Sequence, residues 1–179
     1  SPDGTRIAIG HQRDPLINSW SSSDISIVVV ADQTIRPLVT APGPDQNPIW
    51  SPDGQWLLYS SSGGDTTSNY YRNGQLMRVA ANGGAATRIA ASFDEQIGGL
   101  SWTPSGIYFV AWQKTDRQLF RIDPASWAVR PVSSKALRIG GVSFSGDGRT
   151  VAFAGTTTST ATEVFLSPVE TWAPKALTT

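Results

Sequence analysis

The sequence predicts an all-β fold, a β-propeller built of four-stranded antiparallel blades. Three observations predict this fold. A short turn motif recurs four times, at intervals that match the roughly 40 to 50 residues of a propeller blade. A compact run of β-branched and aromatic residues follows each copy of the motif. No window sustains the apolar period of an α-helix over three turns, so we expect almost no helix.

The turn motif is Trp-Ser-Pro-Asp-Gly or a close variant of it. Its copies lie at 1–4, 50–54, 102–106 and 144–148. Proline presets the first corner of a turn, aspartate bonds backbone N–H groups two residues on, and glycine takes the position of positive φ. Asp53 could instead be a metal ligand or a general base. An active site is needed only once, whereas a turn is needed in every blade, so we interpret Asp53 as a turn former.

Each turn is expected to lead into a buried second strand, then a third strand, then a fourth strand at the outer edge of the blade. The second strands are predicted at 5–9, 55–59, 107–111 and 149–153. The third strands are predicted at 25–31, 75–81, 118–123 and 163–168. The fourth strands are predicted at 35–39, 87–90, 128–132 and 174–177. Because the chain opens on a turn, the first blade lacks its inner strand, and we expect a cut rather than a natural N-terminus.

A single propeller domain is expected over residues 1–179. Its blades are predicted at about 1–45, 46–96, 97–138 and 139–179. Four blades rarely close a ring, so we expect a sector of a larger ring of about seven or eight blades. Open sheet edges also predict that the isolated fragment is poorly stable or self-associates.

Composition argues against several function classes. Lys plus Arg and Asp plus Glu number 14 each, a balance that argues against a nucleic-acid partner. The longest apolar run, 25–31, is too short for membrane insertion. The chain has no cysteine, and its one histidine, His11, is expected in a solvated loop. The string 141–145 lacks the second glycine of a Gly-x-Ser-x-Gly elbow. We therefore expect no catalytic residue, no metal and no cofactor in this chain.

Loops are where binding residues are expected. Insertions are predicted on one face of the propeller, at 10–24, 61–74, 113–117 and 155–162. The richest of them carries Tyr70, Tyr71 and Arg72, which together suit a peptide carboxylate or carbonyl. Alternatively, the tyrosines anchor the loop and Arg72 caps a surface carboxylate. Arg13, with His11 and Trp20, forms a second candidate on the same face.

Four tryptophans could be mistaken for a carbohydrate-stacking set. Because their positions in the blades do not repeat in phase, we interpret them as packing residues between blades. They are Trp56, Trp112, Trp127 and Trp172.

Two family resemblances follow from these motifs. The motif at 50–54 with its apolar strand, and the blade ends at 37–40 and 175–178, resemble the repeat of TolB-type propellers. The segment 142–178, with its polar linker at 156–162, resembles a late blade of prolyl oligopeptidase-family (S9) serine peptidases.

The second resemblance implies the non-catalytic propeller portion of an acylaminoacyl or dipeptidyl peptidase-like serine peptidase. Such a portion gates the access of peptides to a separate α/β-hydrolase domain. Its partners would be that domain, the remaining blades and a peptide substrate. We see no Glu-Glu pair of the kind dipeptidyl peptidases use. The alternative is a TolB-like interaction propeller of the cell envelope with no enzymatic activity, and a third reading is the propeller of a polysaccharide-active lyase. Periplasm and cytoplasm both stay open.

Overall fold

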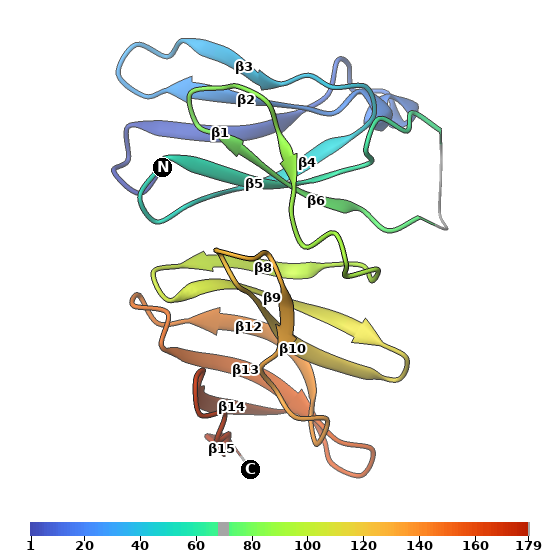
Figure 1. Ribbon diagram of the computed structural model, residues 1–179, viewed down its shortest axis with the longest axis vertical. Coiled ribbons are helices and arrows are strands. Elements are labelled where there is room, and N and C mark those ends of the chain that lie inside the picture. The colour runs from blue at the N-terminus through green and yellow to red at the C-terminus, as the bar shows by residue number, and fades with distance from the viewer. Residues whose placement is uncertain (68–71, 179) are drawn as a thin grey trace. The chain divides into compact units, whose positions relative to one another are not determined.

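The structure, a computed structural model, describes residues 1–67 and 72–178 (Figure 1). Its described residues are arranged in antiparallel β-sheets, with one short 3₁₀ helix, η1 (Ile17–Ser22), that the sequence did not predict. The chain divides into two compact units, residues 1–91 and 92–179. Each unit contains two sheets and is described by itself.

Unit 1 contains sheets I and II. Sheet I has the strand order β1-β2-β3, and sheet II has the order β4-β5-β6-β7. The strands of sheet I are β1 (Arg6–His11), β2 (Asp24–Val29) and β3 (Ile35–Val39). Those of sheet II are β4 (Asp45–Trp50), β5 (Trp56–Ser61), β6 (Gln75–Ala80) and β7 (Thr87–Arg88). β1 and β5 both follow a Ser-Pro-Asp-Gly turn, so β1 corresponds to β5, the second strand of sheet II. Sheet I therefore has no counterpart of the inner strand β4 among the described residues.

Unit 2 contains sheets III and IV, each with four strands in antiparallel order. Sheet III consists of β8 (Gly98–Thr103), β9 (Gly106–Gln113), β10 (Asp116–Ile122) and β11 (Val129–Pro131). Sheet IV consists of β12 (Arg138–Phe144), β13 (Thr150–Thr156), β14 (Glu163–Pro168) and β15 (Lys175–Ala176). The predicted all-β class with antiparallel, four-stranded sheets is therefore confirmed.

Three local predictions are wrong. His11 is not in a loop: it is the last residue of β1, faces Asp24 across the strand pair, and is exposed. The predicted insertion at 113–117 is a tight hairpin, because β9 and β10 pair up to Gln113 and Asp116. Trp112 is about half exposed and therefore does not pack in a core.

The Ser-Pro-Asp-Gly turns share one hydrogen-bond network. In the second copy, the Ser51 hydroxyl donates to Asp53 Oδ1 at 2.5 Å and accepts the Trp56 N–H at 2.9 Å. The Gln55 N–H also donates to Asp53, at 3.0 Å. These bonds hold the pKa of the exposed Asp53 below its usual value. The assignment of Asp53 as a turn former is confirmed.

The same network recurs in the first and fourth copies of the turn. The Arg6 N–H donates to the Ser1 hydroxyl at 2.9 Å, and the Thr150 N–H donates to the Ser145 hydroxyl at 3.0 Å. Asp3 and Asp147 accept the hydroxyl bonds, and those bonds lower the pKa of Asp3 to about 2. One structural device thus places β1, β5 and β13 in the same position relative to their turns.

Each inner strand carries an irregularity where it pairs with the second strand. The register shifts between Gln46 and Ile49 in β4, between Gly98 and Ser101 in β8, and between Ile139 and Val142 in β12. Bulges of this kind bend a strand and re-aim its side chains. In sheet II this bend positions the polar site described below.

Each unit has an apolar core between its two sheets. In unit 1 the buried residues of this core are Ile25, Ile27, Val39, Leu57, Tyr59, Val79 and Ala81. In unit 2 they are Tyr108, Val110, Leu119, Ile139, Val151, Phe153 and Val169. Alternate residues of each strand point into the core, as the period of two along a β-strand requires.

Candidate functional site

A polar cavity of about 420 Å³ opens in unit 1 beside the bulge of β4. Its walls come from the end of β1, the segment before β2, and β4. The lining residues are Gly10, His11, Gln12, Ser23, Gln46, Asn47 and Pro48. With His11 as the one titratable side chain among them, the cavity suits a neutral ligand rich in amide or hydroxyl groups.

Asn47 has the backbone conformation that makes the bulge. Its φ is 56°, in the left-handed region that non-glycine residues rarely adopt. The equivalent residue of β8 is Gly99, with φ of 54°. Asparagine is among the side chains that tolerate this region best, so sheet II presents an amide where sheet III presents none. In sheet II the residue with this conformation therefore carries a hydrogen-bonding side chain, and it lines the cavity.

Other polar groups of the cavity are held by neighbours. His11 Nε2 lies 2.8 Å from the Ser26 hydroxyl, and Gln46 Nε2 donates to the Ser23 hydroxyl at 3.3 Å. Ser23 in turn donates to the Trp20 carbonyl, at the end of η1. The unpredicted 3₁₀ helix thus orients one wall of the site.

Asp45, next to the cavity-lining Gln46, is completely buried. Neither of its carboxylate oxygens has a hydrogen-bond partner among the described residues. Burial raises the pKa of Asp45, and nearby Asp24 raises it further. The Ser61 hydroxyl, on the facing strand, is not in hydrogen-bond geometry with Asp45, and its proximity opposes this shift only in part. A buried carboxyl group of this kind favours the neutral form.

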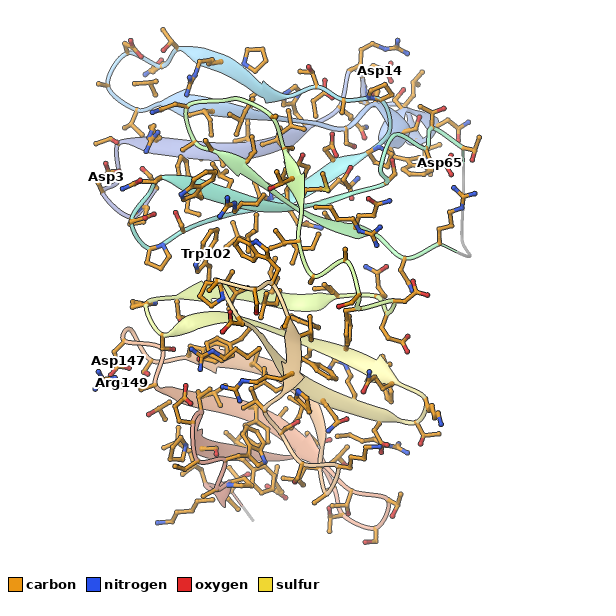
Figure 2. All side chains as sticks on the ribbon, viewed as in Figure 1. Asp3, Asp14, Asp65, Trp102, Asp147 and Arg149 are labelled. Atoms are coloured by element: carbon orange, nitrogen blue, oxygen red, sulfur yellow. The ribbon has the colours of Figure 1, made fainter. Side chains whose placement is uncertain are left out.

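Of the predicted binding residues, Arg72 and Arg13 lie near this end of unit 1, and neither is among the residues that line the cavity. Tyr70 and Tyr71 lie outside the described residues. Arg72 is exposed and pairs with Asp65, with 3.1 Å between Nη1 and Oδ2. Arg13 is also exposed and lies 3.6 Å from Asp14. Figure 2 shows Asp14 and Asp65 at the end of unit 1 opposite the turn that carries Asp3. The role of these four residues in binding stays a prediction.

Sequence reasoning missed Gln46 and Asn47. A signal was present in the sequence, because residues that favour irregular backbone recur near the register shift of each of three inner strands. They are Asn47 and Pro48 in β4, the glycines at 98–99 in β8 and those at 140–141 in β12. The register shift recurs in all three described inner strands, whereas an amide side chain on its left-handed residue occurs in β4 alone, so β4 is where we place the candidate site.

A second cavity, of about 370 Å³, lies at the turn end of unit 1. Arg6, Asp53, Gly54 and Trp56 contribute to its walls. Arg6 donates to the Gly54 carbonyl at 2.8 Å and lies 4.7 Å from the Trp50 ring centroid. Because Arg6 and Asp53 are both engaged in bonds that hold the turns, this cavity is a structural feature.

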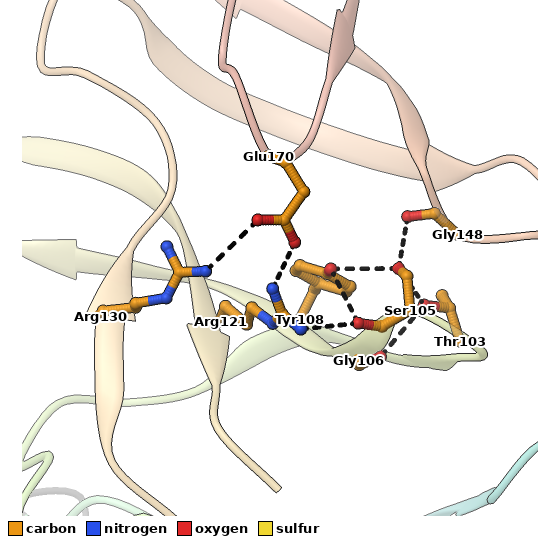
Figure 3. A network of polar contacts seen from close by, with 8 residues as sticks. All are labelled: Thr103, Ser105, Gly106, Tyr108, Arg121, Arg130, Gly148 and Glu170. Carbon is orange, nitrogen blue, oxygen red and sulfur yellow. Dashed lines mark hydrogen bonds and ion pairs between the residues drawn. The ribbon is translucent and has the colours of Figure 1, made fainter.

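The polar network of unit 2 is likewise structural (Figure 3). Arg121 bonds to Glu170 and donates to the Ser105 carbonyl at 2.9 Å. The Ser105 hydroxyl donates to the Gly148 carbonyl at 2.6 Å. Arg130 approaches the other oxygen of Glu170, at 3.8 Å. The network joins three turns of sheets III and IV.

The described residues contain no group of three His, Asp or Glu side chains that could hold a metal ion. Within the same residues, no helix has the length and apolar character needed to cross a bilayer.

Comparison with solved structures identifies the fold. TolB from Acinetobacter baumannii is similar over 99% of this chain and 41% of its own, with 18% identity and a TM-score of 0.73. Pyrococcus horikoshii acylaminoacyl peptidase is similar over 98% of this chain and 26% of its own, with 17% identity and a TM-score of 0.73. The β-propeller domain of the Trilobed protease from Pyrococcus furiosus is similar over 97% of this chain and 49% of its own, with 16% identity and a TM-score of 0.69. The chain therefore has the β-propeller fold, and it spans less than half of each of these three proteins.

No family model matches the sequence. No curated protein matches it either.

Proposed function

We propose that this chain is the non-catalytic propeller portion of a prolyl oligopeptidase-family serine peptidase. In this role it gates the access of peptides to a separate α/β-hydrolase domain, and the remaining blades of a larger ring complete the gate. The observation that carries the proposal is the placing of the insertions and the polar cavity at one end of unit 1, opposite the tight turns. The likeness to an acylaminoacyl peptidase supports the same reading.

The end of unit 1 that carries the insertions and the polar cavity, called the insertion end below, has a chemistry that suits peptides. The Asn47 and Gln46 amides can pair with a peptide backbone through both donors and acceptors. Arg72 and Arg13 add guanidinium donors nearby, each paired with an aspartate, and the Arg72 side chain is 73% exposed although it pairs with Asp65. A guanidinium that keeps most of its surface in water has donors available for a peptide carboxylate.

The alternative is a TolB-like interaction propeller without enzymatic activity. The similarity to TolB from Agrobacterium tumefaciens favours it, because the match covers 62% of that chain with a TM-score of 0.72. In that case the same cavity would bind a segment of a partner protein.

The role of Arg72 is tested by replacing it with alanine in the natural protein that contains these 179 residues. We expect KM to rise about tenfold for peptides with a free carboxylate, because one charge-assisted hydrogen bond contributes roughly 1.5 kcal/mol. Amidated versions of the same peptides should keep their KM, and kcat should be unchanged. Arg149→Ala, at the β12–β13 turn, is the matched control. Equal effects on both peptide classes would contradict a role in carboxylate binding.

A further inference from the structure

Asp45 occupies a place that the other blades fill with an apolar residue. It lies five residues before the aromatic residue at position 50, which precedes the turn. Ile97 and Ile139 lie at the same distance before the aromatic residues at 102 and 144. Ile139 is 1% exposed and packs in the core of unit 2. Sheet II therefore buries a carboxyl group where the repeat has isoleucine.

Two neighbours of Asp45 differ from the repeat in the same direction. β5 and β13 leave their turns in the same register, because the residues at 56 and 150 make the same bond to the serine of their turns. Tyr59 therefore corresponds to Phe153, and Ser61 corresponds to Gly155. Ser61 faces Asp45 across the strand pair, and Tyr59 points to the same side of the sheet. Sheet II thus carries three oxygen-bearing side chains where sheet IV carries none at the equivalent places.

Asp45 is enclosed by the chain itself. It is 0% exposed, so further blades of a ring cannot contact its side chain, and no room is left beside it for a water molecule. Both carboxylate oxygens nevertheless lack a hydrogen-bond partner among the described residues. A buried charge without a partner strongly destabilises the folded state. A compensating group is therefore expected at this place.

The charges around Asp45 favour a cation as that group. Burial raises the pKa of Asp45, and the carboxylate of Asp24, at the start of β2, raises it further. Burial also raises the pKa of Tyr59 to about 12, and the Asp45 carboxylate adds to that shift. Residues 1–67 and 72–178 place no lysine, arginine or histidine in ion-pair contact with either aspartate. The charge of the two carboxylates is therefore not balanced by a cationic side chain.

We propose that Asp45 binds a calcium ion, with hydroxyl oxygens from Ser61 and Tyr59 and with Asp24 supplying the second negative charge. The Asp45 N–H donates to the Ser23 carbonyl at 2.8 Å, so the ion would lie where sheet II meets the start of β2. It would hold β4 against sheet I beside the polar cavity. The described part of the chain has no cluster of three acidic or histidine side chains, so this site relies on hydroxyl groups to complete its oxygen ligands.

The enclosed position favours calcium over other ions. Calcium is bound by protein oxygens at about 2.3–2.6 Å, closer than a water molecule approaches in a hydrogen bond, so a bare ion fits a space that excludes water. Magnesium needs near-ideal octahedral geometry and usually keeps several waters, for which this site has no room. A divalent ion also balances the two carboxylates, whereas sodium would balance one.

The number of bound calcium ions tests the proposal in the natural protein that contains these 179 residues. After equilibrium dialysis against about 1 mM calcium, the unmodified protein should hold one ion more per chain than Asp45→Ile. This variant restores the residue of the repeat and is therefore expected to fold, which far-UV circular dichroism checks. Asp45→Asn, which nearly keeps the shape of the side chain, should lose the same ion. Asp147→Asn removes the same charge from an exposed turn and should bind as much calcium as the unmodified protein.

Thermal melts provide a second measurement of the same ion. Relative to EDTA, about 1 mM calcium should raise the melting temperature of the unmodified protein by about 5 °C more than that of Asp45→Ile. Equal calcium content of the unmodified protein and Asp45→Ile would overturn the proposal. Peptide hydrolysis is not measured in either experiment, so this inference goes beyond the proposed function and can fail without it.

Two further variants test the hydroxyl ligands. Tyr59→Phe introduces the residue of sheet IV, and Ser61→Ala removes the hydroxyl that faces Asp45. Each should weaken calcium binding about tenfold, because each removes one oxygen ligand. Calcium titration followed by calorimetry measures both affinities. Unchanged affinity in both variants would overturn the proposed site.

Discussion

Gly148→Ala is expected to destabilise unit 2 by about 3 kcal/mol. Gly148 has a φ of 71°, and a left-handed conformation costs a non-glycine residue about 1 kcal/mol. An added Cβ would also lie 2.2 Å from the Thr103 hydroxyl and 2.6 Å from the Ser105 hydroxyl. Relieving such an overlap costs roughly another 1–3 kcal/mol. The movement that relieves the overlap would also break the hydrogen bond from the Ser105 hydroxyl to the Gly148 carbonyl, which links two turns of unit 2.

Gly4→Ala separates these two costs. Gly4 occupies the same place in its turn, with a φ of 73°, but a Cβ there would meet nothing within 4 Å. We expect this variant to lose about 1 kcal/mol, the conformational cost alone. Urea unfolding followed by tryptophan fluorescence measures both variants. Equal losses for Gly148→Ala and Gly4→Ala would contradict the close approach of the two turns.

Asp45→Asn is expected to stabilise the calcium-free protein at neutral pH, because the buried amide cannot acquire the charge that burial disfavours in the carboxyl group. Asp45 is completely buried, and its pKa is raised above the ordinary value of 3.8. The folded state therefore binds a proton more tightly than the unfolded state does. The contribution of Asp45 to the free energy of unfolding is present below about pH 4, where its carboxyl group is protonated. It is lost as the pH rises through the pKa that Asp45 has in the folded state. The gain of the variant should grow over the same interval.

Asp53→Asn should show the opposite pH dependence. Hydrogen bonds from Ser51 and Gln55 lower the pKa of Asp53, so its contribution to stability is present at neutral pH and is lost as the pH falls through its folded pKa. Thermal melts of both variants from about pH 2 to about pH 8 test the pair. A loss of stability for Asp45→Asn at neutral pH would show that its carboxylate has a partner in the folded protein.

Local turn chemistry made most of the fold predictable. Ser51, Asp53 and Gly54 determine the turn through bonds within six consecutive residues, so a sequence motif is enough to locate it. The third copy shows the limit of this reasoning. Thr103 pairs with Gly106, so this turn is shorter than the others although its sequence aligns with them. The length of a turn depends on strand register, which one strand alone does not specify.

The candidate site was less predictable than the fold. Arg72 and Arg13 were chosen because charged and aromatic residues in loops suit binding, whereas the cavity is built by Gln46 and Asn47 in a strand. The bulge that exposes them arises from the pairing of β4 with β5, and the burial of Asp45 arises from packing. Helix η1 was missed for a similar reason: no side chain caps its N-terminus, so the sequence carries no start signal for it.

Labelling with a fluorophosphonate serine-hydrolase probe, combined with intact mass, tests the central claim most directly. The sample is the natural protein that contains these 179 residues. We expect a mass well above 19.1 kDa and covalent labelling of a serine outside this segment. A natural protein that carries these blades, shows no labelling and still binds a partner protein through the insertion end would contradict the peptidase assignment and establish the interaction propeller.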